Sequence, residues 1–93
     1  MGYGAAKSNT TGAGNNVLGV QALTSNTTGN NNAAVGGNVM LSNTTGSNNV
    51  AMGQEALRSN TTGGNNTAIG FESLYLNTTG AQNIGLGLSL IHI

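Results

Sequence analysis

The feature that most constrains the fold is a 17-residue period, which runs without insertion or deletion from Gly2 to Leu86. The repeats occupy residues 2–18, 19–35, 36–52, 53–69 and 70–86, and a further one begins at Gly87. We number the positions within each repeat as columns 1 to 17. A fixed period of this order is typical of repeat architectures, in which each unit buries a face against its neighbours. We therefore treat residues 1–87 as one repeat array.

Seventeen residues are too few for a helix pair or a propeller blade, which need about 34 and about 40 residues. They suit one coil of a parallel β-solenoid, whose equivalent strands stack ~4.8 Å apart. We predict an all-β fold, a parallel β-solenoid (β-roll) of about five 17-residue coils. Its strand ends at column 17, whose large aliphatic residues are expected to point inward, while the small residues of column 16 point the other way. Column 5 is also mostly large and apolar. The predicted core residues are Leu18, Val35, Met52, Ile69, Leu86, Leu23, Met40, Leu57 and Leu74.

Three groups of columns have the same polar or small residue in every repeat. Column 1 is always Gly and predicts a corner where a Cβ would clash. Column 14 is always Asn and predicts a ladder of stacked amides. Columns 8 to 11 always read NTTG and predict a turn, because Asn and Gly tolerate positive φ and Thr hydroxyls bond nearby backbone. The predicted corner glycines are Gly19, Gly36, Gly53 and Gly70, and the predicted ladder is Asn15, Asn32, Asn49, Asn66 and Asn83.

Columns 2 to 6 leave two structures open. Segments such as VQALT, QEALR and FESLY contain good helix formers. They are compatible with a second short strand or with a single helical turn, and we favour the strand.

The composition excludes several classes of partner. Gly, Asn and Thr supply roughly half of the chain, which by itself favours disorder. The strict repeat order argues against that interpretation. The net charge is zero, so the chain lacks the basic footprint of a nucleic-acid-binding protein. Its apolar runs are far shorter than the ~20 residues of a membrane-spanning helix. We expect no nucleic-acid partner and no membrane insertion by this segment.

The sequence lacks the residues on which common catalytic and metal-binding sites depend. The chain has no Cys and no Asp, and its one His is His92. Thiolate metal sites, a Ser-His-Asp triad and Asp-based calcium repeats are therefore excluded. Glu55 and Glu72 share column 3 and would lie roughly 5 Å apart in adjacent coils. We interpret them as a solvated pair and predict no enzyme activity, no metal and no cofactor.

The recurring Asn-Thr-Thr triplets have two further interpretations. Each is formally an acceptor for N-glycosylation, as is Asn65 in the triplet that ends at Thr67. We favour turn chemistry, because the whole tetrad including Gly recurs. Stacked Thr rows also resemble those of ice-binding solenoids, but Thr-x-Thr places hydroxyls on one side of a strand and Thr-Thr does not. Ice binding is therefore the alternative hypothesis.

The two ends depart from the array. Residues 88–93, LSLIHI, match the codons CTG-TCT-CTT-ATA-CAC-ATC, which resemble a transposase adaptor used in sequencing libraries. Our hypothesis is that this non-repeat tail is adaptor-derived and that His92 carries no function. Met1 occupies column 17 of a preceding repeat, which predicts a longer array. An independent clone that encodes the hexapeptide with other codons would refute the adaptor origin.

The recurring pattern G-x-x-A-L-x-S-N-T-T-G-x-N-N-x-A-I resembles the head repeats of trimeric autotransporter adhesins, which share the N-x-A-I-G core found at Asn66 to Gly70. It also resembles repeats of bacteriophage tail fibres. The resemblance covers residues 1–87 and departs in repeat length and in the NTTG loop. It implies a left-handed β-roll that assembles as a homotrimer through the small side chains of column 16.

The same resemblance implies an extracellular location, on a cell surface or a virion tail. The function expected from it is a structural and adhesive fibre segment without catalysis. Columns 2, 3, 6 and 12 vary between repeats, and we expect them to display weak, multivalent contacts to a cell-surface glycan or protein receptor.

Overall fold

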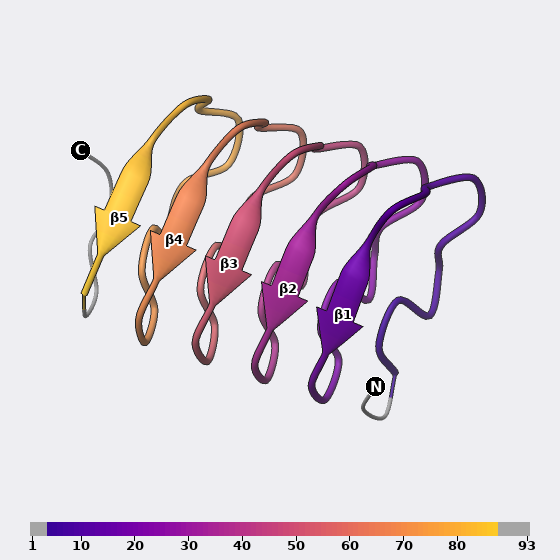
Figure 1. Ribbon diagram of the computed structural model, residues 1–93, viewed down its shortest axis with the longest axis horizontal. Coiled ribbons are helices and arrows are strands. Elements are labelled where there is room, and N and C mark those ends of the chain that lie inside the picture. The colour runs from indigo at the N-terminus through magenta and orange to yellow at the C-terminus, as the bar shows by residue number, and fades with distance from the viewer. Residues whose placement is uncertain (1–3, 88–93) are drawn as a thin grey trace.

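The computed structural model describes residues 4–87, which form a single β-solenoid (Figure 1). The strands are β1 (Asn16–Leu18), β2 (Ala33–Val35), β3 (Val50–Met52), β4 (Thr67–Ile69) and β5 (Ile84–Leu86). They form one parallel sheet in the order β1-β2-β3-β4-β5. Every strand residue pairs with its equivalent in an adjacent repeat, so the predicted all-β parallel solenoid is confirmed. The predicted tail at 88–93, with His92, and the column 17 position of Met1 lie outside the described residues.

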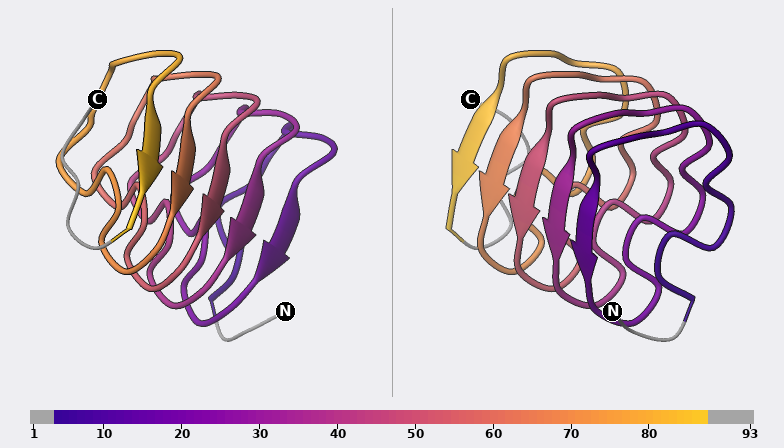
Figure 2. Two further views of the ribbon diagram at one scale, coloured as in Figure 1. Left: turned by 60° about the vertical axis from the view of Figure 1, so that its left-hand side comes forward. Right: turned by 45° about the vertical axis from the view of Figure 1, so that its right-hand side comes forward.

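Each repeat forms one coil, and we number the coils 1 to 5 from the N-terminus. Figure 2 shows the strands side by side on one face, with the return path of each coil following that of its neighbour. The molecule measures 31 × 22 × 16 Å, and the coils stack along the longest axis. Within residues 4–87 there is no helix, and thus none that is long and apolar enough to cross a membrane.

Columns 2 to 6 form neither the strand that we favoured nor a helical turn. Two positions of this segment have positive φ in successive coils, as at Glu55 (62°) and Leu57 (52°). Left-handed residues interrupt both a strand and a right-handed helix, so the segment is a run of tight turns. The turns bring the buried columns 4 and 5 back beneath the sheet.

The prediction that column 17 points inward is wrong for the single chain. The exposed fractions are 57% for Leu18, 43% for Met52, 41% for Ile69 and 60% for Leu86, and Val35 is half-buried. Column 16 instead faces the interior, where Ala34, Ala51 and Ala68 are fully buried. The prediction for column 5 is confirmed. The core consists of Ala22, Leu23, Ala34, Val39, Met40, Ala51, Ala56, Leu57, Ala68 and Leu74.

The narrow interior of each coil explains why column 16 points inward and column 17 points outward. In column 16 of coil 5, a Cβ added to Gly85 would lie 2.7 Å from Leu74 Cγ and 2.7 Å from Ser73 Oγ. Column 16 therefore faces columns 4 and 5 across a narrow interior that the column 5 side chain already fills. Because side chains alternate along a strand, columns 15 and 17 must then point outward.

The column 1 glycines form the predicted corners after each strand. Their φ values lie between 107° and 135°, a region that favours Gly. A Cβ on Gly19 would lie 2.2 Å from the carbonyl oxygen of Gly36, and one on Gly53 would lie 2.6 Å from that of Gly70. Stacking at the coil spacing therefore requires Gly at Gly19, Gly36, Gly53 and Gly70 on both steric and conformational grounds.

Candidate functional surfaces

The asparagines of column 14 form the predicted ladder inside the solenoid. Asn49 donates from its backbone N–H to Asn32 Oδ1 at 3.0 Å and from Nδ2 to the same oxygen at 3.1 Å. The backbone N–H bond recurs from Asn15 to Asn83, at 2.9 Å between Asn83 and Asn66. Each amide oxygen thus binds the backbone of the next coil, and the ladder fixes the register between coils.

A second ladder runs through column 8, where the sequence predicted only a turn. Asn43 Nδ2 donates to Asn26 Oδ1 at 2.8 Å, and Asn60 Nδ2 donates to Asn43 Oδ1 at 2.8 Å. The bond recurs at both ends of the row, from Asn26 to Asn9 and from Asn77 to Asn60. The signal was present in the sequence, because column 8 is as invariant as column 14.

The column 11 glycine joins the two ladders. The carbonyl oxygen of Gly46 accepts from Asn43 Nδ2 at 3.1 Å and from Asn32 Nδ2 at 2.8 Å. Both hydrogens of the Asn43 amide are therefore used, and this side chain is fully buried. In the folded protein, the amide nitrogens of the buried column 8 asparagines are inaccessible to glycosylation, which favours the structural interpretation of NTTG.

The column 9 threonines form a cradle for a carbonyl oxygen of the next coil. The N–H groups of Thr27, Thr28 and Gly29 converge on the carbonyl oxygen of Thr44 at 3.0, 3.2 and 3.2 Å. The Thr27 hydroxyl donates to the same oxygen at 3.3 Å. The column 9 hydroxyls of coils 1 to 4 are thus used in bonds between coils, and column 10 alone of the two Thr columns is exposed in every coil. A single exposed Thr row does not favour the ice-binding alternative.

All four charged residues lie in columns 3 and 6, which we call the charged strip: Lys7, Glu55, Arg58 and Glu72. The Thr24 hydroxyl shows that the two columns adjoin, because it donates to the carbonyl oxygen of Gln21 at 2.7 Å. Arg58 lies over the Tyr75 ring, 5.6 Å from its centroid, and Nη1 donates to the phenol oxygen at 2.5 Å. Within residues 4–87, Arg58 Nε is buried without a hydrogen-bond partner.

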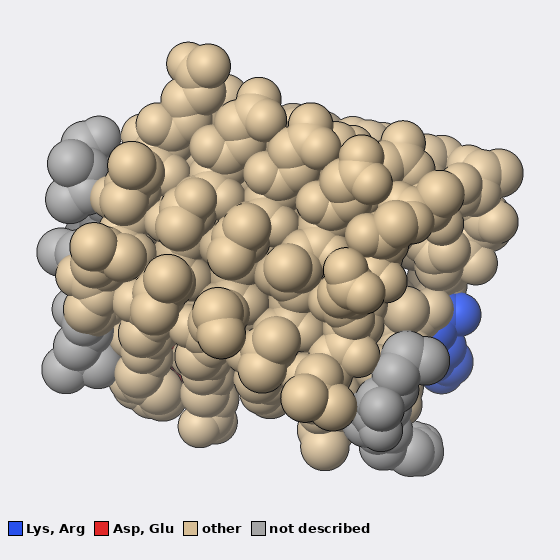
Figure 3. All heavy atoms as spheres, viewed as in Figure 1, with Lys and Arg blue, Asp and Glu red and all other residues tan. Residues whose placement is uncertain are grey.

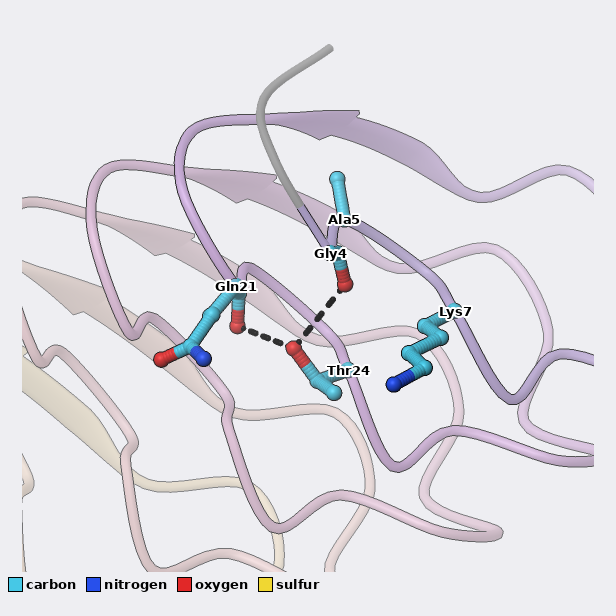
Figure 4. Close-up of a pocket in the computed structure, with 5 residues that line it drawn as sticks. All are labelled: Gly4, Ala5, Lys7, Gln21 and Thr24. Carbon is cyan, nitrogen blue, oxygen red and sulfur yellow. Dashed lines mark hydrogen bonds between the residues drawn. The ribbon is translucent and has the colours of Figure 1, made fainter.

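A pocket of about 420 Å³ lies on this strip at the N-terminal end of the stack (Figure 4). Its lining residues are Gly4, Ala5, Lys7, Gln21 and Thr24. The Thr24 hydroxyl is occupied by the Gly4 and Gln21 carbonyl oxygens, at 3.1 and 2.7 Å. The pocket thus offers one exposed ammonium group and no arrangement of acid, base or nucleophile.

We call the surface formed by columns 15 and 17 of β1 to β5 the outer sheet face. Its side chains differ from those of the charged strip in charge. These columns hold no charged residue in any repeat. Figure 3 shows no Asp or Glu on this view, and Lys or Arg atoms only at one edge. Its exposed large apolar residues are Leu18, Val50, Met52, Ile69, Ile84 and Leu86.

Within residues 4–87, no three His, Cys, Asp or Glu side chains are grouped so that they could hold a metal ion. Comparison with known proteins found no matching family model, no matching curated protein and no matching solved structure. The case for a function therefore depends on the two ladders, the charged strip and the outer sheet face.

Proposed function

We propose that this chain is a structural and adhesive segment of an extracellular fibre, an adhesin head or a virion tail fibre, without catalysis. The observation that carries the proposal is the division of the surface. The outer sheet face is uncharged and mostly apolar, whereas every charged residue lies on the charged strip. A surface divided in this way suits a rod that packs one face against its partners and presents another to solvent.

The rod-like stiffness comes from the coil stack. Buried amide ladders in columns 8 and 14 link every coil to the next, with their side chains inside the solenoid. Buried and satisfied polar networks of this kind specify one register and rigidify it. A slip by a single residue would separate all of the stacked amides at once, so the segment holds its length under load.

The partner face is the outer sheet face, and we propose that three copies pack there as a homotrimer. The side chains of column 16 cannot make this contact, because they are buried inside each coil. Columns 15 and 17 instead offer side chains such as Met52 and Ile69, which are 43% and 41% exposed. Apolar patches of this kind mark association sites when they are contiguous and uncharged.

The solvent-facing columns would then carry the adhesive contacts. Column 3 and column 6 differ between coils, with Glu55 and Arg58 in one and Glu72 and Tyr75 in the next. Column 2 adds Phe71, which is 45% exposed. Aromatic rings beside charged groups suit weak contacts to a cell-surface glycan or protein receptor, and trimerisation would multiply them.

Light scattering on a size-exclusion column tests the lateral assembly. We expect a mass three times that of the 9.2 kDa chain. Met52→Glu places a charge on the outer sheet face and should give the monomer. The matched control Gln54→Glu adds the same charge in exposed column 2 and should leave the trimer intact. A wild-type monomer, or a trimer that survives Met52→Glu, contradicts the proposed contact.

A further inference from the structure

The Asn-x-Thr triplets of the chain differ in whether their amide nitrogen can be reached. Five of the triplet asparagines belong to the column 8 ladder. Four of these are buried, and each donates one hydrogen bond to the preceding coil and one to the column 11 carbonyl oxygen: Asn26, Asn43, Asn60 and Asn77. The fifth, Asn9, is exposed, but its Nδ2 donates to the Gly12 carbonyl oxygen at 2.9 Å and its Oδ1 accepts from Asn26 at 2.7 Å. A sugar on any of the four buried nitrogens would displace a ladder bond.

Asn65 is the remaining triplet asparagine, and its amide is accessible. It lies in column 13 of coil 4 with φ 59°, and its side chain is exposed. Its backbone N–H donates to the Ser47 carbonyl oxygen at 3.0 Å, which fixes the main chain. Its side-chain amide makes no hydrogen bond to any residue between 4 and 87. The Asn65 amide can therefore rotate into an enzyme's active site without breaking a bond of the solenoid.

The hydroxyl that completes the Asn65 triplet is also accessible. Thr67 is the first residue of β4, and its side chain is half-buried on the outer sheet face. Its backbone N–H donates to the Asn83 carbonyl oxygen at 2.9 Å, whereas its hydroxyl has no hydrogen-bond partner in the described part of the chain. The acceptor motif for N-glycosylation requires this hydroxyl two residues after the asparagine. Coil 4 thus holds both required groups on a fixed backbone.

The neighbouring coils show that the hydroxyl distinguishes Asn65 from similar asparagines. Asn31 and Asn48 occupy column 13 in coils 2 and 3, where they are exposed and have φ of 57° and 61°. Two residues later, these coils have Ala33 and Val50, which carry no hydroxyl. Backbone conformation and exposure are therefore shared along column 13, and the complete acceptor motif is found at Asn65.

We propose that Asn65 is an acceptor for an N-linked sugar, transferred from a nucleotide-diphosphate sugar by a glycosyltransferase that recognises Asn-x-Thr. Asn65 Nδ2 forms a bond to the anomeric carbon of the sugar. The bond from that carbon to the diphosphate oxygen breaks, the nucleotide diphosphate leaves with the electron pair, and Nδ2 loses one proton to a base of the enzyme. Thr67 lies on the outer sheet face, so the transfer precedes the proposed lateral assembly. The acceptor site itself does not depend on that assembly.

Glucose transfer to the folded chain tests the site. The probe is UDP-glucose with a soluble N-glycosyltransferase that glucosylates synthetic peptides of all six triplets, and peptide mapping by mass spectrometry locates the product. The Met52→Glu variant is the substrate, because a monomer leaves Thr67 uncovered. We expect one glucose per chain, at Asn65. No glucose at Asn65, or glucose on the buried column 8 asparagines of a chain that circular dichroism shows to be folded, overturns the proposal.

Two substitutions in column 15, made in the same Met52→Glu background, remove and add a site. Thr67→Val removes the hydroxyl and keeps a β-branched side chain, so the glucose at Asn65 should be lost. Val50→Thr places a hydroxyl two residues after Asn48 and should add a second glucose there. Transfer to Asn65 that persists in Thr67→Val, or no transfer to Asn48 in Val50→Thr, also overturns the proposal.

The wild type separates this site from the lateral contact. The proposed trimer covers Thr67, so we expect slower glucose transfer to the wild type than to Met52→Glu. Equal rates of transfer to Asn65 in the two proteins would support the acceptor site and contradict the trimer. Transfer to neither protein would overturn the acceptor site.

Discussion

Replacing Asn49 by Ala tests the column 14 ladder at its centre. Asn49 is fully buried in coil 3 and has coils on both sides. The substitution removes three side-chain hydrogen bonds. They are Nδ2 to Asn32 Oδ1 at 3.1 Å, Nδ2 to the Gly63 carbonyl at 2.9 Å, and the Asn66 N–H to Oδ1 at 2.9 Å.

The expected loss in the free energy of unfolding depends on which hydrogen bonds each partner of Asn49 keeps after the substitution. The Gly63 carbonyl keeps its bond from Asn60 Nδ2 at 3.0 Å. Asn32 Oδ1 keeps its bond from the Asn49 backbone at 3.0 Å. The Asn66 N–H loses its acceptor in a buried position, which costs about 1–3 kcal/mol. Asn32 Oδ1 and the Gly63 carbonyl each lose one hydrogen bond as well. We therefore expect the free energy of unfolding to fall by about 2–4 kcal/mol in total.

Urea unfolding followed by circular dichroism measures this change. The matched control is Gln54→Ala, because the Gln54 side chain is exposed in column 2, away from the outer sheet face, and makes no hydrogen bond within residues 4–87. The control should change the free energy of unfolding by less than about 0.5 kcal/mol. If Asn49→Ala behaves like Gln54→Ala, the ladder does not stabilise the stack and the reasoning fails.

Three further substitutions test the core, the corner and the turns by the same urea assay. Leu57→Ala should lower the free energy of unfolding by about 2–5 kcal/mol, because Leu57 is fully buried in column 5; a change below about 1 kcal/mol would contradict that location. Gly53→Ala should destabilise by more than ~2 kcal/mol, because its Cβ would lie 2.6 Å from the Gly70 oxygen; a neutral result would refute the corner. Gln82→Asn should stabilise by up to about 1 kcal/mol, because Gln82 has φ 61° and Asn tolerates that region better; destabilisation would argue against this turn.

The period predicted the architecture because register is a direct consequence of an unbroken repeat. A 17-residue spacing in the sequence became a 17-residue spacing between paired strand residues, such as Ala34 and Ala51. The column 14 ladder and the column 1 corners followed from the same stacking. Predicting the ladder and the corners did not require knowing the path of the backbone within a coil.

The path within a coil was not predictable in the same way. Columns 16 and 17 are both apolar, and alternation alone does not say which one faces inward. Size misled the interpretation, because the interior is narrow and Leu74 and its equivalents already fill it. The turn at columns 2 to 6 places Leu57 at φ 52°, a conformation that Leu seldom adopts, and no local propensity predicts it.

The column 8 ladder was hidden by an explanation that was only partly right. The NTTG tetrad does form a bend, but none of its residues has positive φ, so the conformational reason for Asn and Gly there was wrong. The partner of the Asn43 amide, Asn26, lies one coil away, and only the stacked structure brings the two amides to 2.8 Å. The bonds of Asn43 to Asn26 and to the Gly46 carbonyl, and not a left-handed backbone, explain why every repeat has Asn in column 8.

Hydrogen exchange of the asparagine side-chain amides, followed by nuclear magnetic resonance, tests the two-ladder solenoid most directly. The structure predicts slow exchange for the fully buried amides of columns 8 and 14 and fast exchange for exposed ones such as Asn48 and Asn65. The slow set is Asn26, Asn32, Asn43, Asn49, Asn60 and Asn66. Slow exchange confined to this set would support the account. Uniformly fast exchange of all asparagine amides would contradict it.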